Sequence, residues 1–371
     1  DLHSFPTRRS SDLTNEKMSG KRLNISKLEL SQIVNELLSH IKERQCKILI
    51  KRFGLDGREP SVLEKIGKEF MVTRERIRQI EADSFRRLAV VEKSDNFKAI
   101  IDQAQREIIK GGGFYEKDAL REALCPQASK LEKHQLMFIL NSAPELKFKK
   151  GSLKMNGFWF LKEHDVQKEV LRAHHLIVKF IKENKQPVRL NKIVEFLQTT
   201  ECKKFFSVDK ARSRAKTICL ISRQINNNII NEWGLRNWRI ISQRGSGEKA
   251  YLVLRQQKKP LHFREITRLI SANWVGEAAL PQTVHNELIK DKRRFVLVGR
   301  GTYGLSSWGL ISGTVKEIIL NCMVEAGKPL DKESIVNYVL SRKQVKPATV
   351  IVTLSDRRFF AKNKQGLFYA K

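Results

Sequence analysis

Apolar residues recur at helical spacing in three blocks between residues 43 and 88, and turn-forming residues separate the blocks. Residues 54–57, Gly-Leu-Asp-Gly, end the first block, because Gly and Asp adopt turn conformations readily. A two-residue link at 71–72 separates the second block from the third. The pattern predicts a helix, a turn, a short helix, a tight turn and a third helix. The apolar positions of the first two helices are Ile48, Leu49, Phe53, Leu63, Ile66 and Phe70.

The third predicted helix has two faces of opposite character. Its inward face carries Ile77, Ile80, Ser84 and Leu88. Its outer face carries the polar and charged residues Arg74, Glu75, Arg78 and Gln79, flanked by Arg76, Arg86 and Arg87. Thr73 precedes the helix and is the predicted N-cap. An amphipathic helix over residues 25–41 would complete the bundle.

This pattern matches the requirements of a helix-turn-helix, in which a short helix pair meets at a sharp turn and the second helix enters a major groove. Arg can donate two hydrogen bonds to guanine, Gln can bridge adenine, and Glu can accept from cytosine. The same charges would equally suit a solvated helix face. The residues alone leave both interpretations open.

Residues 27–92 resemble region four of the sigma-70 family of bacterial transcription initiation factors, most specifically in the run VTRERIRQIEA at residues 72–82. The resemblance implies that the third helix reads a promoter's minus-thirty-five element. We predict base reading by Arg74, Glu75, Arg78 and Gln79. We predict contacts to the DNA backbone by Thr73, Arg76, Arg86 and Arg87. Val62 departs from the family, which usually has a polar Thr there, and residues 89–92 are less basic than usual.

From residue 97 onward the chain repeats a pattern of helix, short extended segment, helix, helix and two strands around a turn. The extended segments lie at residues 113–118, 186–191, 259–264 and 328–333. The expected closing strands lie at residues 157–161, 250–254, 301–305 and 366–370. A period of about 70 residues is too long for a solenoid repeat and suits tandem small domains. Three helices closed by a β-hairpin form a winged helix, so we predict four winged helices.

The third and fourth units, at residues 258–305 and 313–370, resemble the HARE-HTH winged-helix family. That family includes the amino-terminal domain of the RNA polymerase delta subunit. The predicted fold is mostly α, with a helix-turn-helix domain at residues 25–92 and winged helices at residues 97–163, 168–256, 257–308 and 312–371. The wings are predicted to contact DNA through Lys149, Lys150, Arg244, Arg300, Lys362 and Lys364.

Three other signals have ordinary explanations. The GxGxxG run at residues 299–304 is not followed by the helix that a dinucleotide site requires, so we expect a hairpin turn. His174 and His175 have no carboxylate or Cys at metal-binding spacing and are expected on a helix surface. The strand aromatics are expected to fill the core of each unit instead of stacking on bases. These aromatics are Trp159, Tyr251, Tyr303 and Phe368.

The composition favours a polyanionic partner, and nucleic acid before a membrane surface. There are 71 Lys and Arg residues against 40 Asp and Glu, a formal net charge of +31. Basic runs at residues 210–214 and 290–294 suit either phosphate contacts or a solvated surface. The five cysteines form no CxxC pair, so we predict no zinc site and expect reduced thiols. We find no catalytic constellation and predict no metal, cofactor or small-molecule substrate.

The first 13 residues resemble the conceptual translation of a sequencing adapter and are left out of the fold prediction. Either the protein starts at Met18, or further domains lie upstream of the adapter. No aromatic-rich promoter-melting region precedes residue 27, so we do not expect this chain alone to start transcription. No apolar run reaches the roughly 18–20 residues that a membrane helix requires.

We predict a non-enzymatic bacterial transcription factor, cytoplasmic and nucleoid-associated. It would bind promoter-type double-stranded DNA through the third helix and contact RNA polymerase. One alternative is an RNA polymerase accessory subunit that reads little DNA sequence, and another is the DNA-targeting part of an enzyme such as a restriction system. The sequence leaves open the target site, whether the winged helices bind DNA or protein, the oligomeric state, and activation versus repression.

Overall fold

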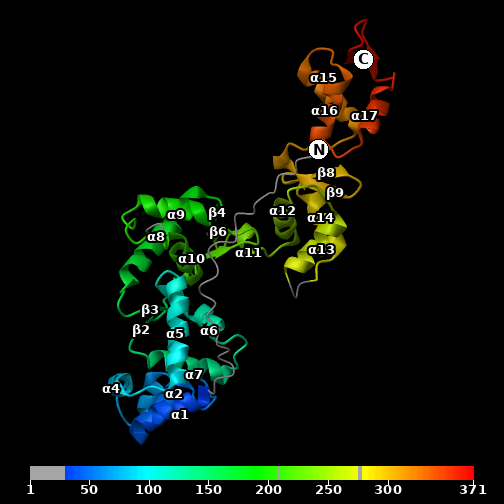
Figure 1. The fold of residues 1–371 in the computed structure, drawn as a ribbon. Coiled ribbons are helices and arrows are strands. Elements are labelled where there is room, and N and C mark those ends of the chain that lie inside the picture. The colour runs from blue at the N-terminus through cyan, green and yellow to red at the C-terminus, as the bar shows by residue number, and fades with distance from the viewer. Residues whose placement is uncertain (1–29, 207–208, 275–277) are drawn as a thin grey trace, which may run out of the picture. The chain divides into compact units, whose positions relative to one another are not determined.

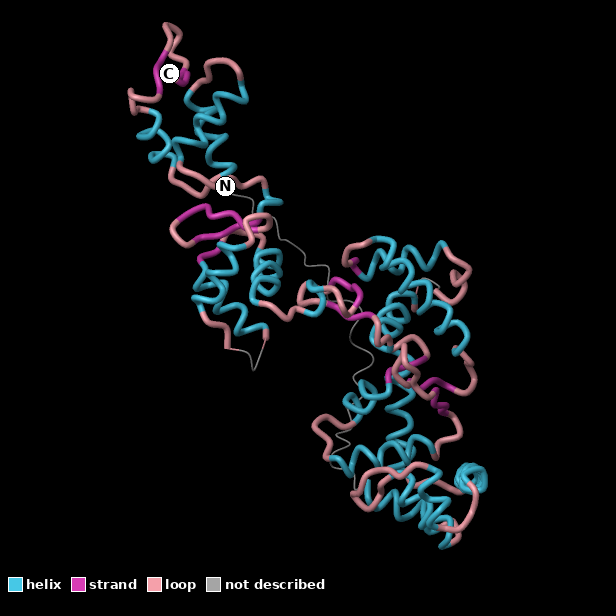
Figure 2. The backbone as a smooth tube through the Cα atoms, turned by 180° about the vertical axis from the view of Figure 1, so that it is seen from behind, coloured by secondary structure: helices cyan, strands magenta, loops and turns pink. Residues whose placement is uncertain are grey.

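The computed structural model describes residues 30–206, 209–274 and 278–371. Helices dominate, the strands are short, and the predicted mostly α fold is confirmed (Figures 1 and 2). The chain falls into two compact units, one of residues up to 177 with 194–223, and one of residues 178–193 with 224–371. The predictions for residues 1–13 and for the start of the first helix, before Leu30, lie outside the described residues.

The helix-turn-helix domain consists of α1 (Leu30–Ser39), α2 (Glu43–Phe53), α3 (Leu63–Glu69) and α4 (Arg74–Val90). Gly54 ends α2 with a φ of 67°, a conformation that glycine adopts without steric cost, and its N–H donates to the carbonyl of Ile50. A small apolar cluster of Ile48, Ile66 and Ile77 joins α2, α3 and α4. The three helical blocks and both predicted turns are therefore confirmed.

The first winged helix follows in the predicted order. Its elements are α5 (Asp95–Lys110), β1 (Phe114–Glu116), α6 (Lys117–Leu124), α7 (Lys130–Asn141), β2 (Leu146–Lys149) and β3 (Phe158–Leu161). The extended segment β1 pairs with the closing strand β3, which lies between β1 and β2 in the sheet. Ser129 and Glu132 form a capping box that starts α7.

The remaining three units repeat this topology, with the short extended segment always paired to the last strand. The second unit has α8 (Gln167–Asn184), β4 (Val188–Arg189), α9 (Leu190–Thr199), α10 (Ala211–Ile221), β5 (Ile225–Asn227) and β6 (Glu232–Leu235). The short α11 (Arg239–Ser242) follows. The third unit has α12 (Ser246–Gln257), β7 (Leu261–His262), α13 (Phe263–Asn273), α14 (Pro281–Lys290), β8 (Phe295–Gly299), β9 (Thr302–Leu305) and the 3₁₀ turn η2 (Ser306–Trp308).

The fourth unit is the simplest version of the pattern. It has α15 (Val315–Ala326), α16 (Lys332–Arg342), α17 (Pro347–Leu354), β10 (Phe360–Lys362) and β11 (Phe368–Ala370). Its extended segment is reduced to a single bridge between Leu330 and Phe368. No helix in the described part of the chain is long and apolar enough to cross a membrane.

The closing strand predicted at residues 250–254 is wrong, because these residues lie inside α12. Ala250, Val253 and Leu254 are buried at helical spacing in the core of the third unit. A short run of aromatic and β-branched residues suits either a strand or a buried helix, and periodicity alone does not separate them. The second unit instead closes with β6, where Trp233 is buried at the position predicted for Tyr251. Three of the four predicted core aromatics, Trp159, Tyr303 and Phe368, are confirmed as buried.

The GxGxxG run lies where the strands β8 and β9 meet, as predicted. Gly301 takes a φ of 65° in the turn, and a Cβ at this position would lie 2.7 Å from Nε2 of His262. The glycines therefore serve a tight hairpin packed against a side chain, and the 3₁₀ turn η2 follows the second strand.

One hydrophobic core joins the helix-turn-helix to the first winged helix. The ring of Phe138 on α7 meets the rings of Phe53 and Phe85 at centroid distances of 5.5 and 5.9 Å. His134 on α7 hydrogen-bonds the carbonyl of Gly54, and Gln135 donates to Ser31 at 2.9 Å. Figure 1 shows α7 directly beside the blue helices α1 and α2. The third helix of this winged helix is thus covered by the helix-turn-helix.

The third helix of the second winged helix, α10, packs in turn against the first. Thr217 donates to the carbonyl of Gly111 at 2.9 Å, and Arg214 donates to the carbonyl of Gly112 at 2.8 Å. The guanidinium of Arg214 also lies over the ring of Phe205. Part of the basic run at residues 210–214 therefore serves packing inside the chain.

His174 is not on a helix surface, and this prediction is wrong. Its side chain is buried on α8 and its Nε2 lies 2.8 Å from Oγ of Ser222, whereas His175 is exposed. Burial, helped by the charges of His175 and Lys154, lowers the pKa of His174 to about 4. The amphipathic pattern of α8 places position 174 beside the buried apolar residues Ala173 and Ile177. This pattern is the signal in the sequence that indicates burial of His174.

Replacing Phe138 with Ala should destabilise the helix-turn-helix and the first winged helix together. Truncating a buried Phe costs about 3–5 kcal/mol of unfolding free energy, because its transfer energy is lost and a cavity is left. Native-state hydrogen exchange should show protection falling in α1 and α2 as well as in α7. Leu153→Ala is the control, since Leu153 is 94% exposed. Loss of protection confined to α7 would contradict a shared core.

Stability should fall between pH 6.5 and 4 through His174. The unfolded chain binds the imidazole proton near the ordinary pKa and the folded chain only near pH 4, so acid favours unfolding in this window. The unfolding free energy of the wild type, measured by denaturant titration, should therefore drop more steeply with acid than that of His174→Asn. His175→Asn removes only the smaller contribution of that charge to the pKa of His174, so its slope should stay steeper than that of His174→Asn. Equal slopes for the wild type and His174→Asn would contradict the argument.

Candidate nucleic-acid interface

The sharp turn between α3 and α4 is fixed by close backbone packing. The N–H of Val72 donates to the carbonyl of Gly67 at 2.9 Å, and a Cβ on Gly67 would lie 2.7 Å from the carbonyl oxygen of Val72. Met71 adopts a φ of 52°, which L-residues seldom take, and its side chain is exposed. The turn therefore sets the angle at which α4 leaves the domain.

Thr73 caps α4 as predicted. Its Oγ1 accepts a hydrogen bond from the N–H of Arg76 at 3.1 Å, which satisfies one of the unpaired donors in the first turn. By contrast, Val62 is the N-cap of α3 and offers no side-chain hydrogen bond. The Val in place of the family's usual Thr thus leaves α3 uncapped by its side chain.

The inward face of α4 is packed and its outer face is exposed. Ile77, Ser84 and Leu88 are fully buried, and Ile80 is half-buried against the small cluster. Phe85, which the pattern did not single out, is half-buried and contacts the shared core. The four predicted base readers are all exposed. They are Arg74, Glu75, Arg78 and Gln79.

Two pairs of side chains organise the outer face. Arg78 donates from Nε and Nη2 to both carboxylate oxygens of Glu75, at 2.6–3.1 Å. Arg76 donates to Oε1 of Gln79 at 3.2 Å. The hydrogen bonds from Arg78 hold the pKa of Glu75 below its ordinary value, and Glu75 raises the pKa of Arg78. Both partners therefore stay charged at neutral pH and are ready to donate to or accept from base edges.

Two acidic residues elsewhere on the domain are paired with basic residues of α2. Lys51 on α2 contacts Glu69 of α3 at 2.5 Å, and Arg52 contacts Glu81 of α4 at 3.4 Å. These pairs cross between helices, but because they are partly exposed they add little to the packing of α3 and α4 on α2.

The predicted backbone contacts lie along the same helix. Arg76, Arg86 and Arg87 are exposed, and Arg86 is paired with Asp83 one turn before it. The structure thus brings all eight predicted side chains onto the start and the outward surface of one helix. Their contacts with DNA stay predictions.

The predicted wing residues divide into two groups. Lys149 and Lys150 lie in the first wing, Arg300 at the tip of the third, and Lys362 and Lys364 in the fourth. Arg244 is not in a wing, because it lies between α11 and α12. That misplacement follows from the wrong strand at residues 250–254. The second wing instead turns through the Asn-rich residues 228–231.

The winged helices also differ in the accessibility of their third helices, where many DNA-binding proteins of this kind read bases. α7 and α10 are packed inside the chain, as described above. The sequence of α7 offers a signal for this, since Leu136, Phe138 and Leu140 leave it apolar around most of its circumference. α14 and α17 keep outward residues, but those of α17 are uncharged.

Comparison with known proteins agrees with this geometry. Residues 37–89 match the family model described as sigma-70, region 4. Residues 247–308 match the HARE-HTH family model, whose description includes the restriction endonuclease HTH domain, and this match places α12 in the third unit.

Two curated relatives match the first of these regions. RNA polymerase sigma factor RpoD of Neisseria gonorrhoeae is 38% identical over 79 residues, which is 21% of this chain and 12% of that protein. RNA polymerase sigma factor SigA of Clostridium acetobutylicum is 44% identical over 73 residues, which is 20% of this chain and 19% of that protein. The chain spans less than a fifth of either relative's length. It carries a segment that matches the sigma-70, region 4 model and a segment that matches the HARE-HTH model.

Replacing Thr73 with Ala should remove the cap of α4 and cost about 1 kcal/mol of unfolding free energy. Thr73→Asn should keep most of the stability, because Asn also caps well. Thermal unfolding of the three proteins checks this. Equal destabilisation by Ala and Asn would show that the hydroxyl cap is not what holds the first turn.

Proposed function

We propose that this chain binds promoter-type double-stranded DNA, with a sequence like the minus-thirty-five element, through the outer face of α4. The observation that carries the proposal is the array of Arg74, Glu75, Arg78 and Gln79, exposed together on a helix whose opposite face is packed. These side chains supply hydrogen-bond donors for guanine, a donor and an acceptor for adenine, and an acceptor for cytosine. The match to sigma-70, region 4 supports the same assignment.

Binding would exchange contacts within the helix for contacts to bases. The Glu75–Arg78 pair is exposed, and solvent-exposed ion pairs of this kind are weak. Base edges can therefore replace it at small cost. Arg76, Arg86, Arg87 and the hydroxyl of Thr73 would lie along the phosphates and fix the register of the helix in the groove.

The rest of the chain would add affinity and contact RNA polymerase. Lys149, Lys150, Arg300, Lys362 and Lys364 lie in wings, where they would contact phosphates without reading sequence. Arg244 does not take this role, because it lies between α11 and α12 and not in a wing. We propose that the protein acts in the bacterial cytoplasm on the nucleoid and has no enzymatic activity, metal, cofactor or small-molecule substrate.

The second candidate is an RNA polymerase accessory subunit that reads little DNA sequence. The burial of α7 and α10 favours it, because two of the four winged helices use their third helix for contacts to protein. The two candidates differ in what α4 does. In the first it reads bases, and in the second its charges are a solvated face.

A binding selection from a random duplex pool at about physiological salt, with wild type beside Arg74→Ala, separates the two. The wild type should enrich a motif like the minus-thirty-five element. Arg74→Ala should lose about 1–3 kcal/mol of binding free energy and relax specificity at one position.

Arg87→Ala is the control for charge, because it should weaken all sequences alike and reduce the salt dependence of binding. If no protein enriches a motif and binding collapses as salt rises, the accessory-subunit function replaces the first candidate.

A further inference from the structure

A cavity of about 640 Å³ that is widely open to solvent lies beside α11 and α12, within the second compact unit. Its walls come from the segment before β4, from α11, from α12 and from the segment between α14 and β8. The volume is in the range of sites that hold small organic ligands. None of the residues predicted to contact DNA from α4 or from a wing lines it, whereas part of the basic run at residues 290–294 does.

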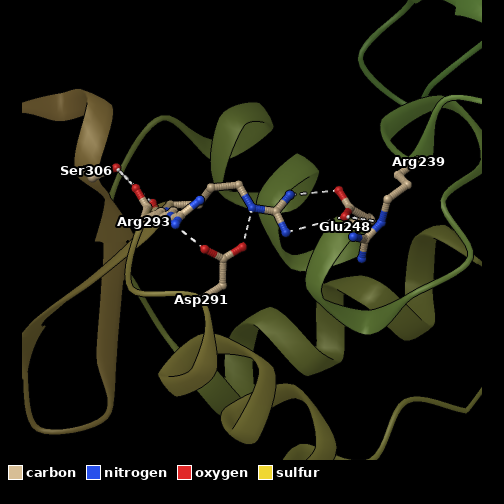
Figure 3. Close-up of polar contacts among 6 residues, drawn as sticks. Arg239, Glu248, Asp291, Arg293 and Ser306 are labelled. Atoms are coloured by element: carbon tan, nitrogen blue, oxygen red, sulfur yellow. Dashed lines mark hydrogen bonds and ion pairs between the residues drawn. The ribbon is translucent and has the colours of Figure 1, made fainter.

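Paired charges hold the walls in place. Glu248 on α12 is buried, and Arg294 donates to its Oε2 at 2.7 Å while Arg239 contacts its Oε1 at 3.3 Å. Arg294 also donates to Asp291 at 2.5 Å. Figure 3 shows Asp291 and Glu248 with one guanidinium group between their carboxylates. Burial opposes the charge on Asp291, but the hydrogen bonds of Arg294 outweigh it and lower the pKa of that carboxyl. Both carboxylates of the cavity are thus occupied in fixing arginines.

A second ion pair supports the cavity from outside. Arg255 on α12 donates to both carboxylate oxygens of Glu232 on β6, at 2.7 and 2.8 Å. Trp274 donates from Nε1 to Gln243 at 2.9 Å. These contacts tie the end of the second winged helix to the third and give the cavity stable sides.

The cavity has a net positive charge. Four cationic side chains line it, those of Lys185, Arg239, Arg293 and Arg294, against the two carboxylates. Lys185 and Arg293 are exposed at its rim, and the side chain of Arg239 is 84% exposed. This excess favours an anionic ligand.

Two aromatic side chains share the lining with these charges. Trp238 precedes α11 and is half-buried, and Tyr251 on α12 is half-buried with the guanidinium of Arg294 5.2 Å from its ring centroid. Partly exposed aromatic rings beside cations are the combination that binds unpaired nucleotides, since the base stacks and the phosphate meets the charge. In a duplex the base faces are already stacked, so an aromatic side chain reaches them only on a single strand.

We propose that this cavity binds single-stranded nucleic acid, with a base against Trp238 and the adjoining phosphates at Lys185 and Arg293. The proposal is separate from duplex reading by α4. The shared chemistry of base and phosphate suits DNA and RNA alike, so the experiment uses both.

The test is fluorescence anisotropy of the full chain with labelled oligothymidylate and oligouridylate at about physiological salt. Trp238→Ala should lower the single-strand affinity about tenfold, as expected for loss of one stacking contact, while Trp238→Phe should retain most of it. Arg293→Ala and Lys185→Asn should each weaken binding several-fold. Asn is chosen at position 185 because the backbone φ there is 55°, which Asn tolerates.

The matched control is Arg236→Ala, which removes the same charge from an exposed position two residues before Trp238 and outside the cavity lining. It should leave the affinity nearly unchanged. Equal losses in Arg236→Ala and Arg293→Ala would overturn the proposal in favour of generic charge. A polyglutamate peptide is added at the same concentration of negative charge as the oligonucleotide. If the peptide displaces the oligonucleotide, the proposal is overturned and the cavity binds acidic peptides.

Arg74→Ala keeps the two proposals apart, because it should lose duplex selectivity and retain single-strand binding. Thermal unfolding of each variant identifies those that lose structure. If Trp238→Ala unfolds, the test relies on Trp238→Phe, which keeps an aromatic ring at this position. A folded Trp238→Phe variant that does not bind single strands would overturn the proposal.

Discussion

The packing of α7 against α1, α2 and α4 is the constraint on which the arrangement of α4 depends. Phe138 lies against Phe53 and Phe85, so the inner side of α4 is held by a core that two domains share. The face of α7 that is buried against α1, α2 and α4 cannot at the same time contact base edges in a major groove. The contact therefore removes α7 from DNA reading and leaves the outer side of α4 as the accessible one.

The same use of a third helix recurs in the second winged helix, where hydrogen bonds from Thr217 and Arg214 hold α10 on the turn after α5. Both helices contribute cohesion inside the chain. The fourth unit departs in another way, because the outward residues of α17 include Ile351 and Val352 and no charged side chain. A large positive net charge thus does not mean that each winged helix reads DNA. On the proposed function, the charges on the wings would contact phosphates and would not read sequence.

Local patterns in the sequence predicted what depends on local physics. The helical period gave α2, α3 and α4, and Thr73 marked the start of α4, because caps and amphipathic faces depend on neighbouring residues. The prediction of a strand at residues 250–254 was wrong, because a short apolar run suits a strand and a buried helix equally well until its packing partners are known. His174 was misplaced for a related reason, since its partner Ser222, the residue that follows α10, lies 48 residues further along the chain. Contacts between domains, such as those of Phe138, are only weakly visible in the sequence. Their one indication is that α7 is apolar around nearly its whole circumference.

The outer face of α4 combines a rigid backbone with loosely held side chains. Thr73 and the buried Ile77 fix the helix, whereas Glu75 and Arg78 are held only by an exposed pair with which water competes. Because Glu75 offsets part of the positive charge, this face attracts phosphate less strongly than a face of Arg alone would. A wrong base pair would leave Glu75 or Arg78 desolvated without a partner, and that cost applies only at the bases. Specificity on α4 would then arise from this penalty, and general affinity from the cations placed elsewhere on the chain.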